Sequence, residues 1–185
     1  MGTDIEREQI HNRRINLRFY RRSDGLYEVE GHLVDTKSHP FRRQLAAEDL
    51  QPGTPLHDIT VRLVIDEAML VHDAQAIMQA IPFSVCAGAK DTLEPLKGLS
   101  IGAGWNKRVR DLLGATASCT HIVELLGPMA TTAYQRLAPQ RLARMNAAGS
   151  EDERAGKVDS CYAYAASRDV VARLWPHLRR NQAPE

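Results

Sequence analysis

The chain has 185 residues, a length that suits one domain with a sizeable core. Its 24 Lys and Arg residues nearly balance 23 Asp and Glu residues, the net charge is +1, and only 5% of the residues are aromatic, so the sequence predicts no nucleic-acid partner. It has no apolar run of the roughly 20 residues that span a bilayer and no signal peptide, which predicts a soluble cytoplasmic protein with no membrane partner. Its three cysteines are far apart, which argues against a disulfide framework or a zinc ribbon.

The first half of the chain has the two-residue periodicity of half-buried β-strands. Residues 16–22 and 26–37 flank the turn triplet Ser23-Asp24-Gly25, a pattern that favours a hairpin. Apolar and polar side chains alternate again over 57–66, and 69–78 follows a short turn as a further strand. We therefore expect a four-stranded antiparallel β-meander.

The second half has the periodicity of helices. Helices are expected over 89–96, 104–113, 118–137 and 140–148, with a last one after Ser167. Pro128 lies inside the longest of them and should kink it. Between the last helices we expect a charged loop over 149–157 and a strand or extended segment over 159–165.

Strands followed by helices predict an α+β fold. The expected architecture is an N-terminal antiparallel β-meander packed against C-terminal helices. A single domain should span 13–178, with flexible termini at 1–12 and 181–185.

Strand phase puts two ionisable side chains on the apolar face of the sheet. Asp35 lies in phase with Leu33, and His57 lies in phase with Ile59 and Val61. An ionisable group at the end of a core face is either a hydrogen-bonded structural residue or part of a pocket at the edge of the sheet. Because the two strands are expected to be neighbours, both interpretations are about equally strong.

The longest predicted helix adds a His–Glu pair. His121 and Glu124 are spaced i, i+3, and Thr131 continues the same stripe beside the apolar face. Such a pair can orient an imidazole for acid–base catalysis or provide two metal ligands, although in isolation it is more often an ion pair on the helix surface. A further ligand from His57 or Asp58 would complete a 2-His-1-carboxylate metal site.

Other reactive and aromatic side chains also have two interpretations. Cys119 begins the long helix, where a thiol can be activated, but its place in the apolar row favours simple packing. Tyr162 and Tyr164 share one face of the segment 159–165. They either line a pocket for an aromatic ligand or belong to the core.

Five stretches of the sequence resemble a bacterial family that is known only as a domain of unknown function. The resemblance covers about residues 13–177, and its most specific part is the block CTHxxELLGPxATTAxQ. The matching stretches are YRRSDGLYEVEGHLVDTK (20–37), PLHDITVRLVID (55–66), GAGW (102–105), CTHIVELLGPMATTAYQ (119–135) and DSCYAYA (159–165). The resemblance links the chain to lyases of aromatic-compound catabolism that release formaldehyde from lignin-derived phenylcoumaran dimers.

This resemblance implies a carbon–carbon lyase that needs no cofactor and takes a small phenolic aromatic substrate. A general base ionises the phenol, the ring ether opens through a quinone methide, and loss of formaldehyde leaves a stilbene. For these steps we expect His57 or His121 as the acid–base, with Asp35 or Glu124 fixing its tautomer and raising its pKa. The candidates for substrate binding are Tyr162, Tyr164, Asp58 and Thr131.

Two other classes of function fit the same residues. One is a metal-dependent enzyme built around His57, His121 and Glu124. The other is a noncatalytic protein that binds a small molecule or accompanies a larger enzyme. The sequence also leaves open whether the chain forms a homo-oligomer.

Overall fold

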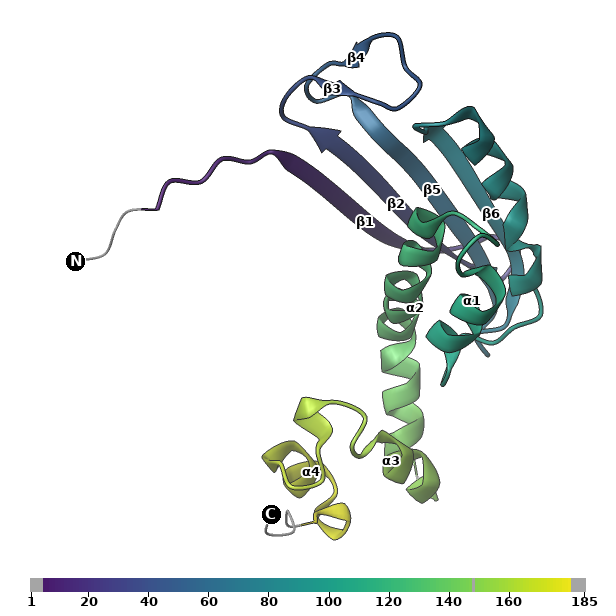
Figure 1. Cartoon of the computed structure of the whole chain (residues 1–185). Helices are drawn as coiled ribbons and strands as arrows, with labels where there is room; N and C mark the ends of the chain where they lie inside the picture. Colours follow the sequence, from purple (N-terminus) through teal and green to yellow (C-terminus); the bar gives the residue numbers. More distant parts are fainter. Residues whose placement is uncertain (1–4, 148, 181–185) are drawn as a thin grey trace. The chain divides into compact units, whose positions relative to one another are not determined.

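The structure is a computed structural model that describes residues 5–147 and 149–180 (Figure 1). The fold is α+β, with an antiparallel sheet first and helices after it, as the sequence predicts. The chain divides into two compact units, Met1–Arg136 and Leu137–Glu185, which are described separately. The predicted termini at 1–4 and 181–185 lie outside the described residues, and the predicted domain bounds 13–178 stay a prediction.

The first unit is built on a four-stranded antiparallel sheet. Its strands are β1 (His11–Arg21), β2 (Tyr27–Lys37), β5 (Pro55–Ile65) and β6 (Val71–Ala80), in the order β1-β2-β5-β6. The predicted β-meander is therefore confirmed. β1 begins at His11, so residues 11 and 12, which were expected to be flexible, belong to the sheet.

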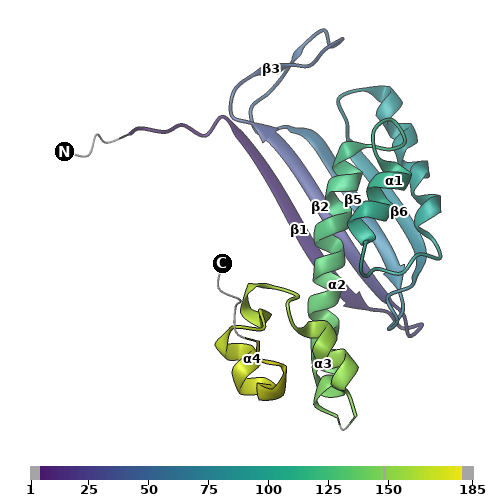
Figure 2. The same ribbon diagram turned by 60° about the horizontal axis from the view of Figure 1, so that its bottom comes forward.

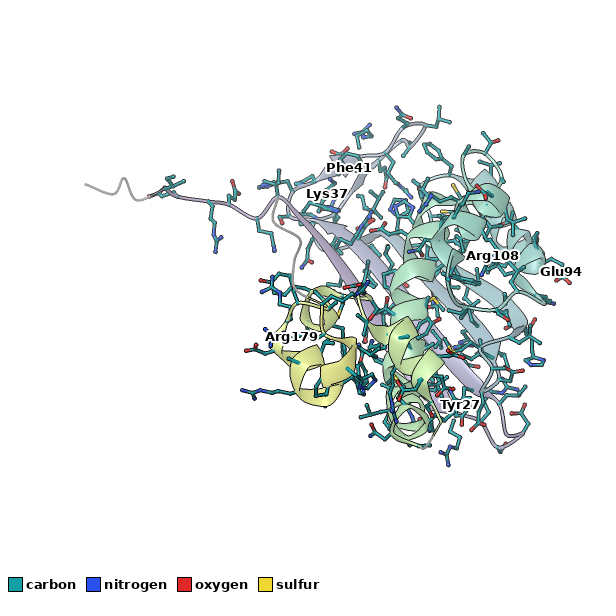
Figure 3. All side chains as sticks on the ribbon, turned by 90° about the horizontal axis from the view of Figure 1, so that it is seen from below. Tyr27, Lys37, Phe41, Glu94, Arg108 and Arg179 are labelled. Atoms are coloured by element: carbon teal, nitrogen blue, oxygen red, sulfur yellow. The ribbon has the colours of Figure 1, made fainter. Side chains whose placement is uncertain are left out.

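A small hairpin interrupts the connection between β2 and β5. Its strands β3 (Phe41–Arg42) and β4 (Asp49–Leu50) have two residues each, too few to show a periodicity in the sequence. The ammonium of Lys37, at the end of β2, lies 5.5 Å from the centre of the Phe41 ring (Figure 3). This cation–π contact joins the hairpin to the end of the sheet.

Helical segments cover one face of the sheet (Figure 1, Figure 2). They are the 3-10 helix η1 (Ser84–Leu96), α1 (Trp105–Leu113) and the first part of α2 (Thr120–Asn146). The core between them and the sheet is aliphatic, and burial of each large side chain contributes about 1.5–3 kcal/mol. Its fully buried members include Val29, Leu33, Ile59, Val61, Leu63, Ile122, Leu125, Leu126 and Met129.

α2 packs tightly against the sheet at Gly31. A Cβ atom at this position would lie 2.9 Å from Sδ of Met129, so only glycine fits without a shift of α2 or Met129. Next to this contact, Nε1 of Trp105 donates a hydrogen bond of 3.0 Å to the carbonyl of Leu126, which joins α1 to α2. These contacts fix the position of the N-terminal turns of α2 over the sheet.

The opposite face of the sheet is polar, as is common for an antiparallel sheet with one solvated face. Nε of Arg62 donates to Glu30 at 3.0 Å, and Nε2 of His32 lies 2.7 Å from Oδ1 of Asp58. Asp58 therefore belongs to the solvated face and His57 to the face that the helices cover.

The helical half differs from the prediction in three places. α2 continues through Pro128 and residue 140 as one helix up to Asn146. A separate helix was expected over 140–148, and residue 148 of that range lies outside the described part. The predicted loop over 149–157 contains α3 (Glu151–Lys157), whose acidic first turn and basic last turn both favour a helix. The prediction of a strand or extended segment over 159–165 is wrong, because Asp159 has φ +61° and the 3-10 helix η2 (Tyr162–Tyr164) follows.

The second unit, 137–185, closes with α4 (Asp169–Leu174) and η3 (Pro176–Leu178). Val171 and Trp175 are both buried in this unit. Across residues 5–147 and 149–180, no helix combines the length and the apolar character that crossing a membrane requires.

Candidate active site

Asp35 and His57 face each other across two neighbouring strands. The antiparallel register of β2 and β5 pairs them directly, next to an irregularity between Asp35 and Thr36. Nδ1 of His57 lies 3.1 Å from Oδ2 of Asp35. Asp35 is only 1% exposed, so its carboxylate is held in the interior at the end of the apolar face.

The first turn of α2 brings a second imidazole to the same carboxylate. Nε2 of His121 lies 3.6 Å from Oδ2 of Asp35, and the centres of the His121 and His57 rings lie 3.8 Å apart, with the ring planes tilted by 33°. The structure thus brings together Asp35, His57 and His121, which come from three different elements. The functional roles that the sequence suggests for them stay predictions.

Arg13 on β1 completes the surroundings of Asp35. Its Nε and Nη2 atoms each donate to one carboxylate oxygen at 2.8 Å, which is a bidentate pair. Nη1 of the same guanidinium donates to Glu124, so Arg13 bridges the sheet and α2. Glu124 therefore reaches the site through Arg13, and it does not orient His121 as we expected.

Arg13 was not singled out from the sequence. The alternation of β1 is the signal that could have found it. Arg13 lies on the same face of the strand as Ile15 and Leu17, which is the face that the helices cover. His11, on the same face of β1, lies with Nε2 3.4 Å from Oδ1 of Asp35.

The pKa of Asp35 lies below its usual value despite its burial. Burial alone raises the pKa of a carboxyl group, but here the hydrogen bonds and positive charge of Arg13 outweigh it. Asp35 is therefore an anion at neutral pH.

The pKa values of His57 and His121 are both lowered. For each ring the largest cause is burial, which disfavours the imidazolium; for His121 the neighbouring His57 and Arg13 lower the pKa further. Asp35 acts in the opposite direction on both rings without reversing the shift. The carboxylate thus raises the pKa of both histidines, as expected, but burial lowers it by more, so the net shift is downward.

These directions fix the tautomer of His57. A neutral imidazole beside a carboxylate anion donates from Nδ1, and Nε2 on the other side of the ring is then a proton acceptor. A carboxylate that orients a histidine in this way is the arrangement found behind the general base of serine hydrolases.

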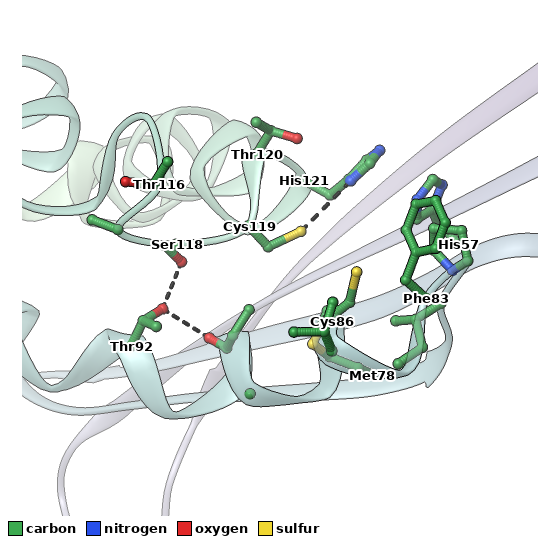
Figure 4. Close-up of a pocket in the computed structure, with 16 residues that line it drawn as sticks. His57, Met78, Phe83, Cys86, Thr92, Thr116, Ser118, Cys119, Thr120 and His121 are labelled. Carbon is green, nitrogen blue, oxygen red and sulfur yellow. Dashed lines mark hydrogen bonds between the residues drawn. The ribbon is translucent and has the colours of Figure 1, made fainter. Parts of the chain in front are cut away.

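His57 and His121 also form part of the wall of a pocket of about 530 Å³ (Figure 4). The pocket lies between the end of β6, η1 and the segment that precedes α2. Most of its wall is apolar, with Met78, Ile81, Pro82, Phe83 and Val85 as the larger members. Its volume and wall are typical of a site for a small, mostly apolar ligand.

Cys119 lines this pocket. The sequence had favoured packing of Cys119 in the core instead. Its thiol is half-buried and lies 3.6 Å from Nδ1 of His121. Cys86 from η1 also lines the pocket.

Two other predicted site residues of the first unit do not join this cluster. Asp58 pairs with His32 on the opposite face of the sheet, and Thr131 is exposed and donates to the carbonyl of Gly127 within α2. Tyr162 and Tyr164 belong to the second unit, where Tyr162 is 76% exposed under Arg168 and Tyr164 stacks on Trp175.

The same trio has the donor atoms of a metal site. One ligand atom from each of Asp35, His57 and His121 lies within 4.8 Å of the other two. Two imidazoles and one carboxylate suit a first-row divalent ion. The carboxylate of this set is Asp35, whereas the sequence had suggested Glu124.

A family model described as "Protein of unknown function (DUF2889)" matches residues 11–135. The chain belongs to the DUF2889 family. The DUF2889 match contains the whole sheet, the cluster around Asp35 and the pocket. It ends at residue 135, so the stretch 159–165 lies outside it, and no curated protein and no solved structure matches the chain.

Proposed function

We propose that the protein is a cofactor-independent lyase that releases formaldehyde from a phenolic aromatic dimer of the phenylcoumaran type and leaves a stilbene. The observation that carries the proposal is the Asp35–His57 pair at the wall of an apolar pocket. The pair supplies an oriented proton acceptor, and the pocket supplies a mostly apolar volume for an aromatic ligand. The choice of substrate comes from the sequence resemblance.

The first half of the reaction opens the ring ether. Nε2 of His57 takes the phenol proton, and the phenolate electrons then displace the ether oxygen from the benzylic carbon. This step produces a quinone methide and a phenoxide on the second ring, which takes a proton from the imidazolium of His57.

The second half breaks a carbon–carbon bond. A base removes the proton of the hydroxymethyl group, the bond to the neighbouring carbon breaks, and formaldehyde leaves. The released electron pair forms the double bond of the stilbene and returns the quinone methide to an aromatic phenolate. Since no electrons are gained or lost overall, the reaction needs no redox cofactor. His121, whose ring centre lies 3.8 Å from that of His57, is the second group within reach for these proton transfers.

The proposal is tested by the turnover of a phenolic phenylcoumaran, followed by stilbene absorbance and released formaldehyde. His57→Gln or His121→Gln should lower the rate by roughly 100- to 10,000-fold, the usual contribution of a general acid–base. His32→Gln is the matched control, because His32 also pairs with an aspartate, but on the opposite face. Unchanged rates in both site variants would remove histidine from the mechanism. No turnover by folded wild type across a panel of such dimers would favour a noncatalytic binding protein.

A second candidate is a metal-dependent enzyme, which the donor atoms of Asp35, His57 and His121 favour. Elemental analysis of the purified protein separates it from the first. A stoichiometric first-row metal that is lost in His121→Ala and retained in Glu124→Gln would support the metal enzyme. Full turnover after extensive chelation, with no metal in the protein, would exclude it.

A further inference from the structure

Two hydroxyl groups lie in the wall of the pocket away from His57. Ser118, just before α2, and Thr92, on η1, approach each other with their oxygens 2.6 Å apart. Both side chains line the pocket and both are half-buried. In Figure 4 they lie at one side of the view, whereas His57 and Phe83 lie at the other, with Cys119 and Cys86 between them.

The direction of the Ser118–Thr92 hydrogen bond follows from a second contact. Oγ1 of Thr92 donates to the carbonyl of Ala89 at 2.8 Å. A hydroxyl has a single proton, so Thr92 cannot also donate to Ser118. Ser118 must therefore donate to Thr92, and its own oxygen keeps lone pairs that can accept a hydrogen bond from a ligand.

The charge of the pocket narrows the class of ligand further. Among the described residues that line it, none is a Lys or Arg. An acceptor oxygen in a pocket without a cation disfavours a carboxylate or phosphate at this end and favours a neutral O–H donor.

We propose that Ser118 recognises a hydroxyl at the end of the ligand distal to His57, so that the pocket selects elongated aromatic compounds with an O–H donor at both ends. This inference rests on the aromatic ligand of the proposed function. A methyl ether at the distal end removes the donor and sets two acceptor oxygens against each other. The structure thus distinguishes a free hydroxyl from its methyl ether.

The test is equilibrium binding of two probes by calorimetry, 4,4′-dihydroxystilbene and 4-hydroxy-4′-methoxystilbene. Wild type should bind the dihydroxy probe about three- to tenfold more tightly, the usual effect of one neutral hydrogen bond. Ser118→Ala should make the two affinities equal. Thr116→Val, which removes another hydroxyl of the pocket wall, is the matched control and should leave the difference unchanged.

Thr92→Val tests the proton direction itself. Without the Thr92 oxygen, Ser118 can turn its proton toward the ligand and donate to the methoxy oxygen, so the methoxy probe should regain affinity relative to the dihydroxy probe. Equal binding of the two probes to wild type, or a difference that persists in Ser118→Ala, would overturn the inference. If either result is found and phenylcoumaran turnover is observed, the inference fails and the lyase proposal stands. If wild type prefers the dihydroxy probe, Ser118→Ala abolishes the preference and no turnover is observed, the inference is supported and the lyase proposal fails.

Discussion

Replacing Arg13 by Met removes the positive charge that faces the buried carboxylate of Asp35. The variant keeps an apolar stem of similar length, so the main change is the loss of two hydrogen bonds of 2.8 Å to Asp35. The carboxylate side chain is 2% exposed, and water cannot replace the guanidinium fully. Asp35 is then a buried carboxylate without its bidentate cationic partner.

The magnitude follows from the geometry. Breaking a buried ion pair by removing one partner costs roughly 3–5 kcal/mol. The Arg13 side chain is 35% exposed, so part of its interaction is already screened by solvent, and we expect a loss of about 2–3 kcal/mol in the free energy of unfolding at pH 7.

The loss should depend on pH with a definite sign. In wild type the pKa of Asp35 is lowered, so its stabilising contribution is complete above its unfolded pKa of about 3.9 and disappears as the pH falls through the lower folded pKa. In Arg13→Met, burial acts without the opposing guanidinium and raises the folded pKa, so protonation relieves the penalty as the pH falls. The difference between wild type and variant should therefore shrink from pH 7 to about pH 4.5.

Urea denaturation at both pH values measures this difference. Arg14→Met is the matched control, because Arg14 is exposed on the opposite face of β1, and its loss should change the free energy of unfolding by less than about 0.5 kcal/mol. A loss in Arg13→Met that is equally small, or one that grows as the pH falls, would show that Arg13 does not stabilise the buried carboxylate of Asp35.

Two predictions concern the contacts that hold the helices over the sheet. Gly31→Ala should lower the free energy of unfolding by about 1–3 kcal/mol, because its Cβ would lie 2.9 Å from Met129, whereas Gly88→Ala meets open space and should be nearly neutral; urea denaturation compares the two. Trp105→Phe should cost about 1–2 kcal/mol, because it removes the hydrogen bond to the carbonyl of Leu126, and an unchanged denaturation midpoint would contradict this assignment.

Part of the site could be predicted from the sequence because strands alternate with a period of two. Asp35 and His57 are in phase with long apolar rows, so their place on the covered face follows from residues near them in the chain. His121 borders the apolar stripe of a helix that must cover the same face. These three residues are the ones that the structure brings together.

The rest depended on contacts that are distant in the sequence. The first residues of β1 are polar and hide the period-two alternation of this strand. The contact between Arg13 and Asp35 was therefore missed, although Arg13 is in phase with Ile15 and Leu17 on the covered face. The pocket wall joins the end of β6, η1 and the segment before α2, and no local pattern connects Phe83 with Ser118. Glu124 was assigned to His121 from helix spacing, but the nearby guanidinium competes for its carboxylate.

The proposed lyase chemistry requires that Asp35 holds His57 as a neutral imidazole with its proton on Nδ1 and with Nε2 free to accept a proton. The protonation of both ring nitrogens can be read directly from long-range ¹H–¹⁵N NMR spectra of the histidine side chains at pH 7, with His57→Gln to assign the signals. We expect that Nδ1 of His57 carries the proton, that Nε2 does not, and that Asp35→Asn disturbs this pattern. A ring that is doubly protonated at pH 7, or one protonated on Nε2, would contradict it.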